Sequence, residues 1–581
     1  MDVTADAPIA ARRVWIALGT LTAAFHLALI FYGLVPNLVA RPLHMALMLP
    51  WVFIFAAQTP RARWTGAVLT ALGIASCLWI ALNHQMLRTQ IALAGTLLFI
   101  AMEGARRAIG WPLPLVALSA LLYGLFGQHI PGAFGHAGTP LRSFFGTLIV
   151  AEGGLWGSLT GVSVTVVAVF VIFGAVLNAG EAGQGFMNVA AAAAGRLKGG
   201  AAKVSVLSSA LFGSISGSAS ANVASTGAVT LPAMTKLGYP KRLAAATEAV
   251  ASSGGQIMSP LMGAGAFVMV ELTGVPYPQI MLAALLPAIL YFATVWQGLN
   301  AFASRYDLQP IPEDQRPARR QVLITSAFFM VPFTTLLLAM FAAGFTPQYA
   351  AALAIFTGLA LLFVDISLRP NPRQGLTRLA DAMLNAGKQV VLCASIIIGV
   401  LGITGLGVKI TSVILSASGG ALWPALLLTA LACLLLGMEV PTTAAYVICI
   451  SVAGPALIEL GLEPLQAHLF VFWFALLSTI TPPVCGAVFI AAGMVQENWL
   501  KVAFTAMALG VGLYIIPLAM IANPSLIRLE SDPIAALLAF FLVGIGLSLI
   551  SQGLIGPSFA VTRAFATVGG RTLCLGTVVL G

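Results

Sequence analysis

The sequence contains few charged residues. Of its 581 residues, 8% are charged and 59% are apolar, whereas soluble domains carry about 25% charged residues. So little charge cannot cover a water-exposed surface of this size, which excludes a soluble multidomain enzyme, and the apolar content excludes a disordered chain. At about 20 apolar residues per membrane-spanning helix, the composition predicts an all-α polytopic membrane protein.

Cysteine and catalytic motifs are also scarce. The six cysteines are scattered, with five of them inside apolar runs and none in a C-x-x-C pair, so we expect buried small apolar side chains rather than disulfides or metal ligands. The sequence contains neither an H-E-x-x-H zinc motif nor a G-x-x-x-x-G-K-[ST] phosphate-binding loop. We therefore expect no enzyme activity, no cofactor and no ATP-driven pumping. A membrane-embedded enzyme or a structural scaffold is the remote alternative.

Apolar runs bounded by charged residues, Pro or Gly predict membrane-spanning helices along the chain. The first run follows Arg12 and Arg13 and has no clear cleavage site, which favours a retained span over a signal peptide. The run at 90–102 is short and could lie at the membrane interface instead. The predicted spans are residues 14–35, 43–58, 64–82, 90–102, 111–130, 157–179, 243–271, 279–300, 322–344, 347–367, 389–408, 466–490, 496–521 and 533–551.

Basic residues are distributed unevenly between alternate loops. With the N-terminus in the cytoplasm, 23 of the 28 Lys and Arg residues fall on the cytoplasmic side and 5 on the other. This positive-inside bias predicts that both termini face the cytoplasm. It also accounts for the net charge of +10, so nucleic-acid binding has no support. Glu103, Arg106 and Arg107 are predicted to form a charge cluster at the cytoplasmic end of one helix.

Two apolar stretches are too long for one crossing and are interrupted by small and polar residues, at 200–238 and 420–461. The alternation of sides holds only if each stretch returns to the side it started from. We therefore predict two re-entrant helical hairpins, the first from the cytoplasm and the second from outside. Irregular backbone at membrane depth is tolerated only where protein or a wet cavity satisfies its polar groups, so such interruptions usually mark a site.

The hairpins belong to an internal repeat. Gly199 and Gly419 open them at an offset of 220 residues, and each hairpin is followed by a span broken at proline, QIMSPLMGA (256–264) and TITPPVCGA (479–487). By the alternation of sides, the broken spans run in opposite directions. This is the inverted-repeat pattern of secondary transporters, whose substrate and ion sites lie near the bilayer midplane.

The repeat also sets the predicted domain boundaries. Residues 1–140 have no counterpart in it and are predicted to form an added N-terminal helical module. Residues 141–525 form the predicted transport domain, with repeats at about 141–300 and 322–521. Residues 526–581 add one helix and a cytoplasmic tail.

The candidate site residues carry oxygen atoms or are small, and they lie at the hairpin tips and just before the proline breaks. A proline frees a carbonyl one turn earlier, so these regions offer oxygen ligands. Side-chain oxygens of Ser216, Ser218, Asn222, Thr442 and Thr443 could bind Na+, and the adjoining helix N-termini would favour an anionic group. Alternatively, the small residues only allow tight helix packing and the prolines only kink helices. The candidates for ion or substrate binding are Ser216, Gly217, Ser218, Asn222, Thr226, Ser253, Gly254, Gln256, Glu439, Pro441, Thr442, Thr443, Thr479 and Thr481.

Glu248 and Glu439 are acidic residues within the predicted membrane region, where carboxylates are functional candidates by default. Glu439, at the tip of the second hairpin, is either a cation ligand or proton carrier, or a solvated or Arg-paired rim residue. Glu248 is interpreted as structural, because Lys241 and Arg242 lie within two helical turns of it.

Four long motifs resemble the large membrane subunit of tripartite ATP-independent periplasmic (TRAP) transporters. They are GSISGSASANVASTGAVTLPAMTKLGY (213–239), TEAVASSGGQIMSPLMGAGAFVMVE (247–271), LGMEVPTTAAY (436–446) and HLFVFWFALLSTITPPV (468–484). The pattern resembles the fused permeases of the TAXI type, and residues 1–140 match a fused small subunit in helix count and in the Glu-x-x-Arg-Arg ending at Glu103 to Arg107.

This resemblance implies an inverted-repeat elevator transporter in a bacterial inner membrane. It would import a small organic acid from a periplasmic TAXI-type substrate-binding protein, driven by a gradient of Na+ or H+. The hairpin tips match the family's ion and substrate region. Glu439 stands where many relatives carry glycine, which leaves the choice between Na+ and H+ open, and Ser259 stands where a second proline is common. A binding-protein-independent anion symporter of related fold is the alternative.

Overall fold

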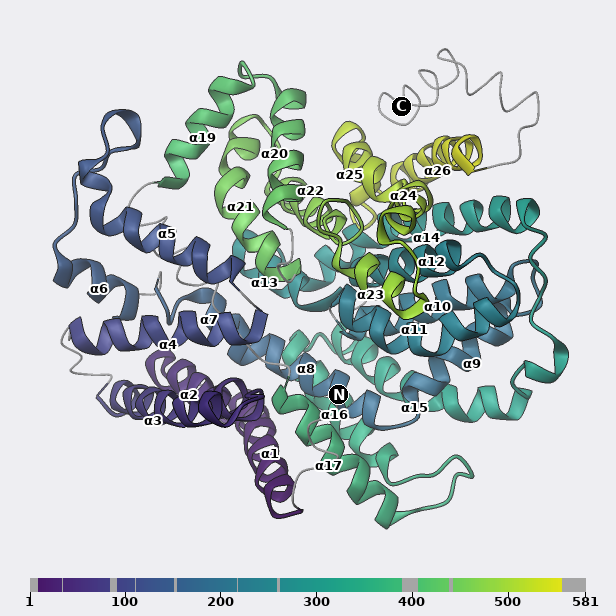
Figure 1. Ribbon diagram of the computed structural model, residues 1–581, viewed down its shortest axis with the longest axis horizontal. Coiled ribbons are helices and arrows are strands. Elements are labelled where there is room, and N and C mark those ends of the chain that lie inside the picture. Colours follow the sequence, from purple (N-terminus) through teal and green to yellow (C-terminus); the bar gives the residue numbers. More distant parts are fainter. Residues whose placement is uncertain are drawn as a thin grey trace. The chain divides into compact units, whose positions relative to one another are not determined.

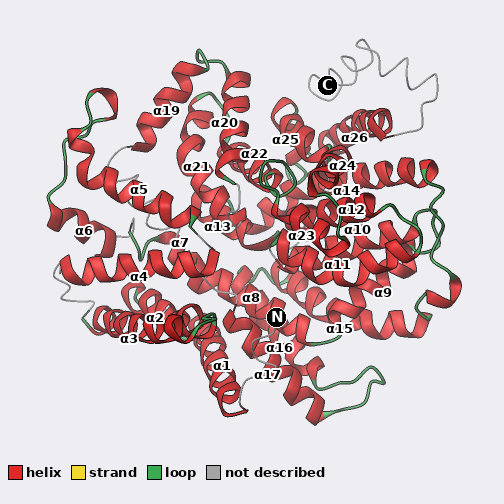
Figure 2. Cartoon of the chain, in the orientation of Figure 1, coloured by secondary structure: helices red, strands yellow, loops and turns green. Residues whose placement is uncertain are grey.

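The computed structural model describes residues 9–33, 35–83, 91–109, 111–150, 154–216, 218–258, 262–388, 406–437 and 442–555. These residues fold into helices joined by loops, and no β-strand occurs among them (Figure 2). The predicted all-α class is therefore confirmed. Most of the predicted span at 389–408 and the tail after residue 555 lie outside the described residues.

Eight helical stretches in the described part of the chain are long and apolar enough to cross a membrane. Each overlaps one of the predicted spans, which supports the multi-pass interpretation. They comprise α1 (Ile9–Phe31), α2 (Asn37–Pro50) with η1 (Trp51–Phe55), α3 (Pro60–Leu82), α7 (Ser158–Val162) with η4 (Ser163–Val167) and α8 (Ala168–Ala179), α14 (Tyr277–Arg305), η6 (Glu313–Gln315) with α15 (Arg319–Leu337) and η7 (Leu338–Ala342), α24 (Trp499–Leu509) with α25 (Gly512–Ala522), and α26 (Pro533–Ile555).

Helix α26 shows why these helices suit a lipid environment. Its 23 residues include no charged side chain, and it packs against α14. Ala536, Ala539 and Val543 are buried, whereas Ile534 and Leu538 are largely exposed. Large apolar side chains on the outward face would be costly in water but are favourable against lipid.

The described chain divides into two compact units. The first comprises residues 1–182 and 328–413, and the second comprises residues 183–327 and 414–581. The domain boundaries predicted at residues 140 and 525 come from the internal sequence repeat and not from the packing of the chain, so they stay predictions. The remaining helices are α4 (Ile91–Ile109), α5 (Pro112–Phe126), η2 (Gly127–His129), η3 (Gly132–Phe134), α6 (Leu141–Val150), α9 (Ala182–Ala194), α16 (Pro347–Leu362), α17 (Pro372–Lys388), α19 (Leu406–Ala417) and η8 (Pro524–Ile527), besides those of the hairpins and broken spans.

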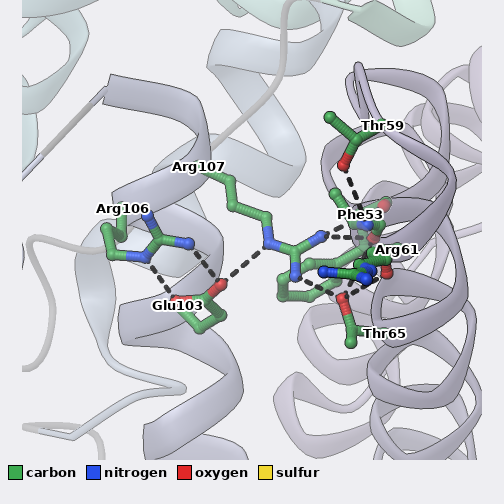
Figure 3. Close-up of polar contacts among 8 residues, drawn as sticks. Phe53, Thr59, Arg61, Thr65, Glu103, Arg106 and Arg107 are labelled. Atoms are coloured by element: carbon green, nitrogen blue, oxygen red, sulfur yellow. Dashed lines mark hydrogen bonds and ion pairs between the residues drawn. The ribbon is translucent and has the colours of Figure 1, made fainter.

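The predicted charge cluster of the first unit is confirmed. Glu103 near the end of α4 accepts hydrogen bonds from Arg106 Nε at 2.6 Å and Arg107 Nε at 2.8 Å (Figure 3). Arg107 also donates to the Phe53 carbonyl at 3.3 Å and to Thr65 Oγ1 at 3.2 Å. The guanidinium of Arg107 therefore joins α4 to η1 and α3, so the cluster is a cross-link between helices as well as a helix end.

Both predicted hairpins form pairs of packed helices in the second unit. The first consists of α10 (Gly200–Ser216) and α11 (Ala219–Lys236), and the second of α20 (Leu422–Leu436) and α21 (Thr442–Glu459). In Figure 1, α20 and α21 lie side by side. Gly199 and Gly419, which precede the hairpins, both adopt left-handed backbone with φ of +70° and +61°, a conformation that favours glycine. The return of each hairpin to one membrane side stays a prediction.

Both predicted broken spans are interrupted helices. After the first hairpin, α12 (Lys241–Gly254) ends in the 3-10 turn η5 (Gly255–Ile257), and a separate helix α13 (Gly263–Thr273) follows. After the second hairpin, α22 (Pro464–Leu477) ends before the turns that precede α23 (Gly486–Val495). These interruptions expose helix ends and unpaired backbone groups in the middle of each span.

Candidate functional site

The side chain of Asn222 joins the tip of the first hairpin to the first broken span. It is fully buried, and its Nδ2 donates to the Ser209 carbonyl at 2.9 Å and to the Ser252 carbonyl at 3.5 Å. Gly213 and Gly255 allow this approach, because a Cβ on Gly213 would lie 2.6 Å from the Gly255 Cα. One amide therefore fixes α11 against both α10 and α12.

Ser218 and Thr226 are two further residues near the tip of the first hairpin. Ser218 is the N-cap of α11, where its Oγ accepts a hydrogen bond from the Ala221 N–H at 3.3 Å. Thr226, one turn after Asn222, donates to the Asn222 carbonyl at 2.8 Å and also contacts the carboxylate of Glu248. Their role in ion or substrate binding stays a prediction.

Glu248 lies at the centre of a buried hydroxyl cluster. Its side chain is 0% exposed, and Ser205 Oγ donates to its Oε2 at 2.7 Å. Ser209 Oγ and Ser252 Oγ donate to its Oε1 at 3.2 Å and 3.3 Å. Thr226 and Thr230 also donate to the carboxylate. We name these five hydroxyls, from Ser205, Ser209, Thr226, Thr230 and Ser252, the hydroxyl cage.

The surroundings of Glu248 differ from those predicted from the sequence. Lys241 and Arg242, on which its structural interpretation rested, form no ion pair with it among the described residues; Arg242 donates to the Tyr306 hydroxyl at 2.8 Å instead. The sequence does hold a signal for the cage. Ser205 with Ser209, Thr226 with Thr230, and Glu248 with Ser252 are each spaced i, i+4 and so share one helix face.

The two interruptions meet in space. Ser253 Oγ, at the end of α12, lies 2.8 Å from Thr479 Oγ1, which follows α22. Thr481 Oγ1 lies 2.7 Å from the Tyr514 hydroxyl on α25, and Ser478 Oγ donates to the Gly437 carbonyl at 2.9 Å. The structure therefore brings together the predicted site residues Ser253 and Thr479, which are 226 positions apart in the sequence.

The packing around the interruptions is reciprocal. Helix α13, from the first broken span, contacts α21 and α22 of the second repeat, whereas α23, from the second broken span, contacts α11 and α12 of the first. Each short helix thus packs against helices of the other half as well as against its own, α14 in the case of α13 and α24 in the case of α23.

Gln256 and Gly254 line the first interruption. Gln256 is 2% exposed, and its Nε2 has no hydrogen-bond partner among the described residues. Gly254 leaves room for the ring of Tyr291, because a Cβ there would lie 2.0 Å from that ring, and the Tyr291 hydroxyl donates to the Val250 carbonyl at 2.7 Å. A buried amide with free donors next to a helix interruption can bind an oxygen atom of a ligand.

The second hairpin tip is described only in part. Two residues of this tip, Glu439 and Pro441, lie outside the described residues. The same holds for Gly217 and for the side chain of Ser216 at the tip of the first hairpin. Thr442 is buried and Thr443 half-buried at the start of α21, and no hydrogen bond joins either to the first hairpin within the described contacts. The same part of the chain holds no group of three His, Cys, Asp or Glu side chains that could bind a metal.

The four cysteines in the described part of the chain, Cys77, Cys433, Cys449 and Cys485, are buried, as the sequence predicted.

Comparison with known proteins identifies the family. Residues 96–535, more than half of the chain, match the family described as tripartite ATP-independent periplasmic transporter, DctM component. The C4-dicarboxylate TRAP transporter large permease protein DctM of Pseudomonas aeruginosa is 24% identical over 325 residues, which cover 54% of this chain and 73% of the relative.

Two relatives match over longer segments. The isethionate TRAP transporter permease protein DctMQ of Oleidesulfovibrio alaskensis is 25% identical over 452 residues, covering 72% of this chain and 69% of the relative. The ectoine/5-hydroxyectoine TRAP transporter large permease protein UehC of Ruegeria pomeroyi is 24% identical over 435 residues, covering 71% of this chain and 96% of the relative. The match to the family covers both hairpins and both broken spans, and the chain therefore belongs to the DctM family of TRAP transporter permeases.

Proposed function

We propose that this protein imports a small organic acid across a bacterial inner membrane and receives it from a separate periplasmic substrate-binding protein. Membership of a tripartite periplasmic transporter family supports the need for such a partner. The substrate class is supported by relatives named for C4-dicarboxylates and isethionate, which are organic acids.

The observation that carries this proposal is the contact between the two interruptions. Ser253 Oγ and Thr479 Oγ1 are 2.8 Å apart, and α13 and α23 follow the two interruptions along the chain, so each begins with backbone N–H groups that have no partner within its own helix. Helix N-termini favour an anionic group, and the buried amide of Gln256 adds donors. Paired interrupted helices of this kind form the substrate sites of secondary transporters.

A cation gradient is the proposed energy source, with Na+ as the first candidate. Oxygens of Ser216, Ser218, Asn222, Thr442 and Thr443 form the proposed Na+ site, since Na+ is a hard cation that prefers oxygen ligands. The alternative is coupling to H+ through Glu439.

The mechanism we propose is an elevator movement of inverted repeats. Both hairpins and both broken spans belong to the second compact unit, as expected for a body that moves as one piece. We further propose the TAXI type and a fused small-subunit module at the N-terminus. The family match begins at residue 96, so residues 1–95 of the proposed module at 1–140 precede it and residues 96–140 lie within it. Both termini are proposed to face the cytoplasm.

Uptake into proteoliposomes tests this function. The periplasmic substrate-binding protein that partners this permease would first be identified, purified and screened against organic acids, and the acid that it binds would be the labelled probe. We expect uptake only with both the loaded binding protein and an inward Na+ gradient. Robust uptake of the free acid without the binding protein would instead establish the anion symporter. Uptake that ignores Na+, follows the pH gradient and is lost in Glu439→Gln would establish H+ coupling through that residue.

A further inference from the structure

Glu248 has no counter-charge in the described part of the structure. The helices packed around α12 are α10, α11, α14, α23 and α24, and none of their charged side chains forms an ion pair with it. Lys203 of α10 places its ammonium over the Trp296 ring at 5.1 Å, and Arg305 of α14 lies over Tyr306. The other cationic residues on these helices and on α12 itself lie at their ends and are Lys236, Lys241, Arg242 and Lys501.

A buried carboxylate without a cation is costly, and the protein can avoid that cost by binding a proton. The other titratable groups on the surrounding helices do not replace a counter-charge: the Tyr291 hydroxyl of α14 donates to the Val250 carbonyl, and α23 contains no ionisable residue. Charge neutralisation at Glu248 therefore requires a proton or a bound cation.

The crowding of the carboxylate favours the proton. A carboxylate offers about four lone-pair directions, and all five hydroxyls of the cage lie within hydrogen-bond reach of its two oxygens. A metal ion would have to displace these hydroxyls to reach an oxygen atom. A proton needs no such space.

The hydroxyl cage can satisfy both protonation states of Glu248. Thr226 Oγ1 is in reach of the carboxylate and also of the Asn222 carbonyl at 2.8 Å, and Thr230 Oγ1 is in reach of the carboxylate and of the Thr226 carbonyl at 3.1 Å. Each hydroxyl has only one hydrogen to donate. With Glu248 ionised, both threonines donate to it. With Glu248 protonated, the acid O–H donates to one threonine, which then donates to its own helix carbonyl.

We propose that Glu248 binds and releases a proton during the transport cycle, and that this step changes the hydrogen bonds of the first hairpin tip. The link to the tip is short, because Thr226 lies one turn from Asn222, and the Asn222 side chain bonds the carbonyls of Ser209 and Ser252, two members of the cage. This inference rests on the proposed transport function. It adds a proton site that is distinct from the proposed Na+ site and from Glu439.

Transport by Glu248→Gln tests the proposal, because glutamine keeps the shape of a protonated acid but cannot release a proton. The assay uses proteoliposomes with the loaded binding protein, a Na+ gradient and a pH-sensitive dye inside. We expect the variant to exchange internal for external substrate while net uptake and the accompanying lumenal pH change are lost. The exposed Glu271 of α13 provides the matched control, and Glu271→Gln should behave as wild type. Net uptake by Glu248→Gln with an unchanged pH profile would overturn the proposal.

A second measurement keeps the proposal testable if the variant transports nothing. In infrared difference spectra of the purified protein between acidic and alkaline pH, exposed carboxylic acids contribute carbonyl bands in every variant. The wild-type and Glu271→Gln spectra should each contain one further carbonyl component that the Glu248→Gln spectrum lacks. A wild-type protein without a Glu248-dependent band would refute proton binding. A wild-type protein that shows the band but takes up no substrate would instead refute the proposed transport function.

Discussion

The two hairpins share a backbone plan but differ in chemistry. The first surrounds the carboxylate of Glu248 with hydroxyls, whereas the offset of 223 residues places Val471 at the matching position of the second repeat, and the offset of 220 places Tyr446 opposite Thr226. Tyr446 bonds His468 Nδ1 at 2.6 Å, and α20 is almost entirely apolar. The repeat therefore preserves architecture, while a buried carboxylate among the described residues of these helices occurs in the first half only.

This difference shows which parts of the repeat are set by folding and which by function. The glycines before the hairpins and the prolines at the interruptions recur because the backbone requires them in both halves. The hydroxyl cage does not recur, so helix packing alone does not require it. A polar network that occurs in one half only, and that helix packing does not require, is a candidate for a functional site.

A carboxylate placed in the second half should have the largest effect on the stability of the protein. Val471 is fully buried on α22 between Phe470 and Phe472. Val471→Glu would bury an acid with no hydroxyl cage, which should cost roughly 4 kcal/mol or more of stability. Thermal unfolding in detergent and the yield of monodisperse protein would measure this. Val471→Thr is the control, because a threonine hydroxyl can bond its own helix. A well-folded Val471→Glu protein would mean that the second half also accommodates a carboxylate.

Asn222→Ala should have the next largest effect. The substitution leaves the Ser209 and Ser252 carbonyls without their amide donor, which should cost about 1–3 kcal/mol, and we expect substrate uptake to fall to background. Thr235→Val on the same helix is the matched control, since Thr235 bonds only carbonyls of its own helix, at Leu231 and Pro232.

The second hairpin supplies the counterpart, Thr442→Ala. Within the described contacts Thr442 bonds no other helix, so uptake should be lost with little change in thermal stability. Uptake that survives both Asn222→Ala and Thr442→Ala would show that the hairpin tips do not form the site.

The sequence predicts the architecture of this site better than its centre. Proline, glycine and clusters of small polar residues are local signals, so the hairpins and the interruptions at Pro260 and Pro483 could be located directly. The i, i+4 spacings place each pair of cage residues on one helix face, but the cage forms only because α10, α11 and α12 turn these faces toward one another, which the local sequence does not encode. Ser205 and Thr230 therefore resembled ordinary packing residues, and Glu248 was assigned to the wrong neighbours.

Removing the contact between the two interruptions should have the smallest effect on stability. It nevertheless tests most directly whether the two halves meet at one site. Ser253 Oγ also lies 2.8 Å from the Ala249 carbonyl and Thr479 Oγ1 lies 2.7 Å from the Leu476 carbonyl, so each hydroxyl has an acceptor nearby in its own half when its partner is removed. Removing one hydroxyl therefore leaves the other satisfied, and each single substitution, Ser253→Ala or Thr479→Val, should cost little. A double-mutant cycle on unfolding free energy should give a coupling of about 0.5–1 kcal/mol. A coupling of zero would mean that the two halves do not meet through these hydroxyls, and the proposed substrate site would lose its main support. A measurable coupling would show that halves with different chemistry interact directly at the two interruptions, because the double-mutant cycle isolates the Ser253–Thr479 pair from the surrounding packing.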